Sequence, residues 1–126
     1  MRLLLDTVTF LWAVSSPAQL SRKAIAALRN ESTVREISAI SLSEIAIKSA
    51  KGKLTLGQDD LDSGIASLHL RVLPYTAEHA FRLFDLPPHH ADPFDRQIIA
   101  QALAESIPVV TSDETFRLYK GLKVIW

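Results

Sequence analysis

Short apolar runs that end abruptly at polar residues constrain the fold of this chain most strongly. Leu3-Leu4-Leu5 is followed at once by Asp6, and the run over residues 107–110 is followed by Thr111, Ser112 and Asp113. Continuous apolar runs are typical of parallel strands that are buried on both faces. The sequence therefore predicts an α/β fold, with a mostly parallel central sheet, helices on both faces and right-handed crossovers.

Helical apolar spacing recurs between the predicted strands. Ser41 to Glu44 has the pattern of a capping box, which would open a helix that Gly52 closes. Asp92 followed by Pro93 has the pattern of an N-cap and a first helical residue. We expect further strands over residues 34–40, 71–73 and 121–126, and helices whose apolar stripes cover residues 20–28, 61–68, 77–84 and 98–103.

The length and composition limit the kinds of protein that this chain can be. A chain of 126 residues suits one domain, which we expect to span residues 1–126. It contains no cysteine, so disulfides, thiolate metal sites and cysteine nucleophiles are excluded, and a metal would need oxygen or imidazole ligands. Fourteen basic residues balance fourteen acidic ones, so the chain carries no overall charge that would attract nucleic acid.

The first seventeen residues superficially resemble a signal peptide. Asp6 interrupts the apolar stretch, however, and leaves only residues 8–14 as an uncharged core, which is short for a secretory segment. No other stretch approaches the length of a membrane span. We therefore expect a soluble, unprocessed protein of the cytoplasm.

Four acidic residues are placed where they could meet in space. Asp6 and Asp113 follow predicted strands, and Glu44 and Asp95 are predicted in the first turns of two helices. Taken singly, each carboxylate has a simpler explanation as a helix cap or as a favourable charge at a helix start. Taken together, they would line the crevice at the carboxyl ends of the strands. Such a pocket suits Mg²⁺ or Mn²⁺, which can activate water for phosphodiester hydrolysis.

Four ordered motifs resemble those of PIN-domain ribonucleases of the VapC toxin type, and together they span nearly the whole chain. They are Leu4-Leu5-Asp6-Thr7, Ser41-Leu42-Ser43-Glu44-Ile45-Ala46-Ile47-Lys48, His90-Ala91-Asp92-Pro93-Phe94-Asp95-Arg96 and Val110-Thr111-Ser112-Asp113.

This resemblance implies a PIN-like fold and a metal-dependent endoribonuclease, which would be the toxin of a type II toxin–antitoxin system. It implies Mg²⁺ or Mn²⁺ as cofactor, RNA as substrate, a cognate antitoxin as inhibitor and a homodimer as the assembly. By the same resemblance, the catalytic and metal-binding residues are Asp6, Glu44, Asp95 and Asp113. Thr111 is expected to orient a carboxylate or water, and Asp92 to serve mainly as a cap.

The chain departs from the family pattern at three positions outside the four acids. Val8 stands where many relatives have histidine, Ser43 where tryptophan is common, and Ala91 where arginine often precedes the acidic motif. The missing imidazole and basic side chain could weaken RNA contacts or alter partner recognition. One alternative is therefore a catalytically weak PIN-fold binding module. A phospho-acceptor receiver-like domain is less favoured, because Asp6 stands alone and the last predicted strand ends the sequence.

Several other side chains allow two interpretations. Lys48 could approach RNA phosphates or simply pair with Glu44 one helical turn earlier. Arg96 could neutralise the acidic pocket or contact phosphate. Phe10 and Trp12 are expected in the core or at a dimer face. The four histidines, at positions 69, 79, 89 and 90, show no metal-ligand spacing, so we expect them to be structural or exposed.

Overall fold

A five-stranded parallel sheet forms the centre of the computed structural model, which describes residues 1–126. The strands are β1 (Arg2–Leu5), β2 (Val34–Ser38), β3 (Arg71–Leu73), β4 (Val109–Val110) and β5 (Val124–Ile125). The α-helices are α1 (Thr7–Ser15), α2 (Arg22–Arg29), α3 (Ala39–Ala50), α4 (Gln58–Ser67), α5 (Ala77–Phe81) and α6 (Pro93–Glu105). Short 3₁₀ turns cover Pro17–Gln19, Arg82–Asp85 and Glu114–Leu118.

The first strand lies in the middle of the sheet. The strand order is β3-β2-β1-β4-β5, and Leu4 is aligned with Glu36 of β2 on one side and with Val109 of β4 on the other. All pairings are parallel, so the carboxyl ends of the strands meet at one edge. The predicted α/β class is confirmed.

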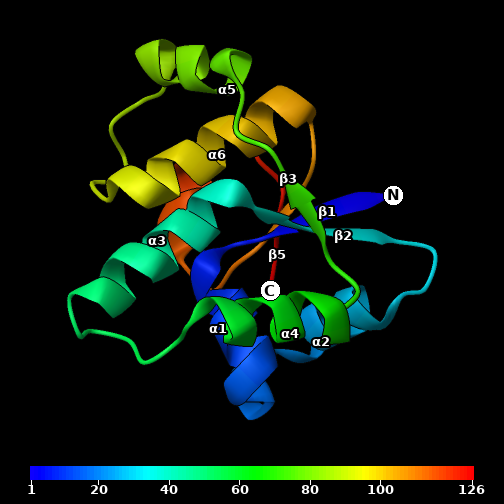
Figure 1. The fold of residues 1–126 in the computed structure, drawn as a ribbon. Helices are drawn as coiled ribbons and strands as arrows, with labels where there is room; N and C mark the ends of the chain where they lie inside the picture. The colour runs from blue at the N-terminus through cyan, green and yellow to red at the C-terminus, as the bar shows by residue number, and fades with distance from the viewer.

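Successive residues of β1 point into two separate hydrophobic cores. Leu4 packs with residues of α6 on one face, whereas Leu3 and Leu5 pack with Phe10 and with residues of α2 and α4 on the other. Figure 1 shows the same two layers, with α5 and α6 on one side of the sheet and α1, α2 and α4 on the other. This alternation follows from the two-residue period of a strand and explains why β1 has no exposed face.

The helix that carries Glu44 begins earlier than predicted. Ser38 is its N-cap and accepts a hydrogen bond from the Ile40 amide at 3.0 Å, so β2 ends at residue 38. The predicted capping box at Ser41 is wrong, because Ser41 is fully buried and its hydroxyl accepts a hydrogen bond from Thr7 at 2.8 Å. Glu44 therefore lies in the second turn of α3 and not in the first.

The sequence gives little sign of helix α1. Asp6 is its N-cap, and the Asp6 carboxylate accepts a hydrogen bond from the Thr9 amide at 2.8 Å. The helix is apolar almost all round, so it has no amphipathic stripe to reveal it. Phe10 is buried as expected, while Trp12 is half-buried against Trp126 with ring centres 5.8 Å apart.

The predicted apolar stripe over residues 77–84 is wrong in two of its members. Phe81 and Phe84 are 66% and 86% exposed. After Phe81 the α-helix gives way to a 3₁₀ turn, and the tighter winding changes the direction of the side chains that follow, including Phe84. His79 is buried instead. Throughout the structure, every helix is too short or too polar to cross a membrane.

Candidate metal centre

Asp6 and Thr111 are joined at the edge where β1 and β4 end. The Thr111 hydroxyl donates to Asp6 Oδ2 at 2.6 Å, and the Thr9 amide donates to Asp6 Oδ1 at 2.8 Å. Asp6 is buried, and burial raises the pKa of its carboxyl group above the ordinary value although these hydrogen bonds oppose the shift. Thr111 thus orients a carboxylate, which is the geometry expected of it from the sequence.

Asp95 and Asp113 come together around a histidine. His90 Nε2 lies 2.7 Å from Asp113 Oδ2 and 3.3 Å from Asp95 Oδ2. One ligand atom from each of these three residues lies within 4.8 Å of the others, so the three could hold a metal ion. The sequence-based expectation that His90 is merely structural or exposed missed this contact. The one feature of the sequence that indicates this contact is that His90 belongs to the same motif as Asp95.

The electrostatics of Asp95 connect it with the other predicted acids. Burial and then the neighbouring Asp92 raise its pKa to about 7, with smaller contributions from the charges of Asp6 and Glu44. Burial also raises the pKa of Asp113, but hydrogen bonds from His90 and Thr115 outweigh it, and the net shift is downward. Mutual repulsion at Asp95 is the property that a bound cation would relieve.

Glu44 reaches this region from α3 with one oxygen unpaired. It is 6% exposed, and its Oε2 accepts a hydrogen bond from Lys48 at 2.5 Å. The hydrogen bond to Glu44 raises the pKa of the Lys48 ammonium group. Glu44 Oε1 is buried and has no hydrogen-bond partner. Buried polar atoms are rarely left without a partner, so this unpaired carboxylate oxygen suits a cation ligand.

The donor set fits a hard divalent cation. Carboxylate oxygens are the ligands that Mg²⁺ and Mn²⁺ favour. Asp95 and Asp113 supply closely spaced carboxylates, and Glu44 supplies a buried oxygen that has no hydrogen-bond partner. The four acids predicted from the sequence, Asp6, Glu44, Asp95 and Asp113, remain the candidate ligands: Asp95 groups with Asp113, Glu44 has an unpaired oxygen, and the charge of Asp6 acts on Asp95. Asp92 has a different task. Its Oδ1 accepts hydrogen bonds from the amides of residues 94 and 95, so it caps α6, as expected.

Arg96 donates hydrogen bonds to the chain segment that leads into α6. Its guanidinium group donates to the carbonyl oxygens of Leu86, Pro87 and His90 at 3.2, 2.9 and 3.4 Å. These bonds hold Arg96 against the loop that carries His90. The sequence-based suggestion that Arg96 neutralises the pocket or contacts phosphate stays a prediction.

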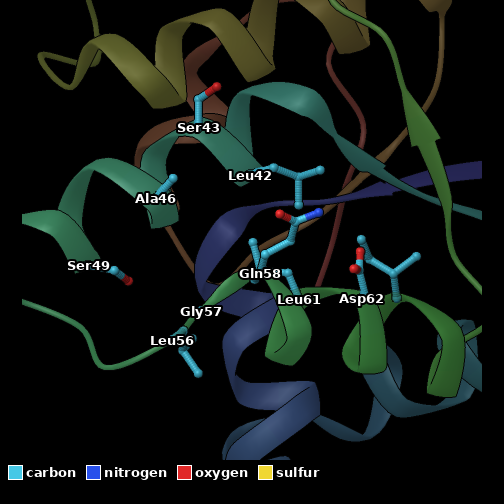
Figure 2. A pocket seen from close by; sticks show the side chains of 10 residues that line it. Leu42, Ser43, Ala46, Ser49, Leu56, Gly57, Gln58, Leu61 and Asp62 are labelled. Carbon is cyan, nitrogen blue, oxygen red and sulfur yellow. The ribbon is translucent and has the colours of Figure 1, made fainter.

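The largest cavity of the molecule lies elsewhere. It measures about 560 Å³ and separates α3 from the start of α4. Figure 2 shows Leu42 and Ala46 on the α3 side and Gln58 and Leu61 on the α4 side. Helical periodicity places these α3 residues on the face opposite Glu44 and Lys48. Helix α3 therefore presents its acidic residue to one site and an apolar surface to another.

Residues 3–122 match the PIN domain family. The chain belongs to the PIN domain family. This assignment removes the receiver-like alternative and agrees with the all-parallel sheet. The search of curated proteins gave no match.

Several solved VapBC structures contain a chain with the same fold. The PIN domain superposes on a chain of VapBC2 from Rickettsia felis, bound to a promoter DNA fragment, with a TM-score of 0.76 and 21% identity over 98% of this chain and 97% of the other. DNA-bound VapBC from Salmonella typhimurium gives a TM-score of 0.73 and 20% identity, over 98% of this chain and 96% of the other. VapBC-5 from Mycobacterium tuberculosis gives a TM-score of 0.62 and 18% identity, over 98% of this chain and 97% of the other. The fold is that of a VapC-type PIN domain.

Proposed function

We propose that this PIN domain is the endoribonuclease toxin of a type II toxin–antitoxin system and acts in the cytoplasm. It would hydrolyse RNA phosphodiester bonds with a water activated by Mg²⁺ or Mn²⁺. The observation that carries the proposal is the grouping of Asp95 with Asp113, on which the charge of Glu44, with its buried unpaired Oε1, also acts through Asp95. These acids come from α6, α3 and the segment after β4, and a metal-assisted hydrolase would use their oxygens to hold one cation.

Each residue of the site has a defined task in this proposal. Asp6, Glu44, Asp95 and Asp113 would bind the cation, and Thr111 holds the Asp6 carboxylate in position. When bound, the cation polarises the phosphate and activates the attacking water. Lys48 keeps an ammonium group beside Glu44, where it can partly offset the charge of an approaching RNA phosphate.

The proposal includes a protein partner. The superposable structures from Rickettsia felis, Salmonella typhimurium and Mycobacterium tuberculosis are VapBC complexes, and the last is described as a toxin–antitoxin system. We infer a cognate antitoxin for this chain and, from the family resemblance, a homodimer. Copurification with the product of a short reading frame beside this gene would test the partner independently of catalysis.

A second candidate function is a PIN-fold module that binds RNA or protein but cuts poorly. Val8 is 44% exposed, and Ala91 is also exposed. At these two surface positions the chain has apolar side chains where many relatives carry an imidazole or a basic side chain. This alternative keeps the fold and the metal while lowering the rate of cleavage. It predicts cation binding without efficient RNA hydrolysis.

Purified protein incubated with single-stranded RNA would separate these functions. We expect cleavage with added Mn²⁺ or Mg²⁺, loss of cleavage in excess EDTA, and a fall of at least about 100-fold for Asp95→Asn, in the range seen when one electrostatic catalytic group is removed. Asp59→Asn is the matched control, because Asp59 is an exposed acid in the first turn of α4. Equal cleavage by Asp95→Asn and the parent would refute the proposed site. Cation binding without cleavage would favour the binding module.

A further inference from the structure

His90 places an imidazole against two carboxylates of the candidate site. Its Nε2 atom lies 2.7 Å from Asp113 Oδ2 and 3.3 Å from Asp95 Oδ2. Histidine is a common metal ligand, so one interpretation makes His90 a third ligand beside the two acids. The hydrogen bond at the other ring nitrogen, Nδ1, argues against this interpretation.

The second ring nitrogen of His90 accepts a hydrogen bond. The backbone amide of Asp92 donates to Nδ1 at 3.1 Å. A neutral imidazole carries one proton, and an amide N–H facing Nδ1 assigns that proton to Nε2. The short contact with Asp113 is therefore an N–H donated from Nε2 to Oδ2.

A metal-bound histidine has the reverse arrangement. It ligates through one nitrogen and donates the other ring N–H to a carboxylate, carbonyl or water. If His90 Nε2 ligated a cation, its Nδ1–H would point at the Asp92 N–H, and two donors would face each other. The Asp92 amide is fixed at the start of α6, where the Asp92 carboxylate caps the helix, so it cannot turn away easily.

The backbone of His90 is also held in place. Its own amide donates to the Tyr119 hydroxyl at 2.8 Å, and its carbonyl accepts from Arg96. The ring packs edge-on against Phe116, with ring centres 5.7 Å apart. The imidazole is therefore positioned by the surrounding chain and not by a ligand.

The hydrogen bond from His90 fixes the direction of Asp113. Asp113 Oδ1 already accepts from the Thr115 amide at 2.9 Å, so the carboxylate is held at both oxygens. An oxygen that accepts one N–H retains a second lone pair for a cation. Ligating carboxylates in metal sites are commonly held by such outer hydrogen bonds.

We propose that His90 is a positioning residue, which holds Asp113 beside Asp95 as an Nε2–H donor to Asp113 and does not itself ligate the cation. This inference rests on the proposed function, because it assumes that the two acids bind a divalent cation. It gives His90 a task that differs from that of Asp92, which acts as a helix cap.

Manganese binding by the full chain tests the inference without measuring activity. We expect His90→Ala to weaken Mn²⁺ binding about 10–100-fold in calorimetry, which is the usual cost of losing an outer hydrogen-bond partner. His90→Gln should restore most of the affinity, because its amide N–H₂ reaches the position of Nε2. His89→Ala is the matched control, since it removes an exposed imidazole at the adjacent position. Pulsed electron paramagnetic resonance of Mn²⁺ in the parent should show no directly bound imidazole nitrogen.

Two results would overturn the inference. A strong coupling from a bound ¹⁴N nucleus that disappears in His90→Gln would make His90 a ligand. Affinity for Mn²⁺ in folded His90→Ala equal to that of the parent would leave it without a role in positioning. If His90→Ala does not fold, the affinities of His90→Gln and His90→Asn for Mn²⁺ can be compared instead. The asparagine amide is too short to reach Asp113, so His90→Asn should bind Mn²⁺ more weakly than His90→Gln, and equal affinities would overturn the inference. Failure of the parent itself to bind Mn²⁺ would instead refute the proposed function, and this inference with it.

Discussion

Thr111 and Asp6 are joined by a 2.6 Å hydrogen bond although they lie 105 residues apart in the sequence. The bond crosses from the segment after β4 to the residue after β1, and both partners are buried. Strand pairing brings the two ends of these strands together, and the hydroxyl then orients a carboxylate that also caps α1. One contact thus connects the sheet, the first helix and the candidate site.

Replacing Thr111 with valine should destabilise the protein without changing its shape. The loss of the hydroxyl leaves Asp6 Oδ2 without its hydrogen bond in a buried position, which costs about 1–3 kcal/mol. Urea denaturation would measure the change in the free energy of unfolding. Thr111→Ser retains the donor and should lose much less; equal losses for the two variants would show that the methyl group, not the hydrogen bond, stabilises this position.

Replacing Arg96 with methionine should loosen the segment that leads into α6. The guanidinium group bonds to three carbonyl oxygens, and hydrogen bonds to charged groups are worth about 1.5–3 kcal/mol. Arg96→Lys should recover little of this stability, because one ammonium group cannot reproduce the planar fork. Denaturation midpoints would test both variants, with Arg117→Met as the control, because Arg117 is exposed and pairs only with Glu114 of its own turn. Full recovery by lysine would contradict the explanation.

Glu105 should make stability depend on pH in the acidic range. The hydrogen bond from His79, and then the one from Arg2, lowers the pKa of Glu105 below its ordinary value of 4.5. A lowered folded-state pKa gives stability that is present above the unfolded-state pKa and is lost as pH falls through the folded-state pKa. We therefore expect Glu105→Gln to be less stable than the parent at pH 7, and the difference to shrink below about pH 4.

Urea denaturation at several pH values would check this dependence. Glu31→Gln is the control, because Glu31 is exposed in a turn. A difference between the parent and Glu105→Gln that stays constant from pH 7 to about pH 3 would mean that lost packing, and not charge, accounts for the effect.

Gly64 should resist enlargement even though it lies inside helix α4. A Cβ atom at this position would lie 2.9 Å from Val14 Cγ2 and 3.1 Å from Phe10 Cζ. Overpacking typically costs about 1–3 kcal/mol, which exceeds the gain of roughly 1 kcal/mol from a better helix former. Gly64→Ala should therefore lower the thermal midpoint. At Gly57 the nearest atom to an added Cβ is 3.8 Å away, so Gly57→Ala should change stability less.

Local rules predict the strands and the start of α6 because short-range chemistry determines them. The run ending at Leu5 forms β1, and Asp92 with Pro93 opens α6 where expected. The start of α3 is not decided in this way. Ser38 and Ser41 are both good caps by local rules, and the choice depends on the contact of Ser41 with Thr7, which is distant in the sequence.

The arrangement of the candidate site could likewise be predicted from the sequence only in part. Parallel strands bring Asp6 and the segment of Asp113 to one edge of the sheet, so their approach follows from the predicted fold. The position of His90 does not, because Tyr119, Arg96 and the Asp92 amide fix it after the chain has folded. The outward position of Phe84 likewise depends on a switch from α-helix to 3₁₀ turn that its spacing does not reveal.

The central place of β1 also governs when the site can exist during synthesis. Chains are made from the N-terminus, so β1 and β2 can pair early, while the other side of β1 stays an open edge until β4 is made. Until then, Leu4 lacks its neighbour Val109 and Asp6 lacks Thr111. A nascent chain that stops before residue 111 therefore carries an exposed strand edge and no assembled acidic site. The proposed activity would therefore need a polypeptide completed at least through Asp113.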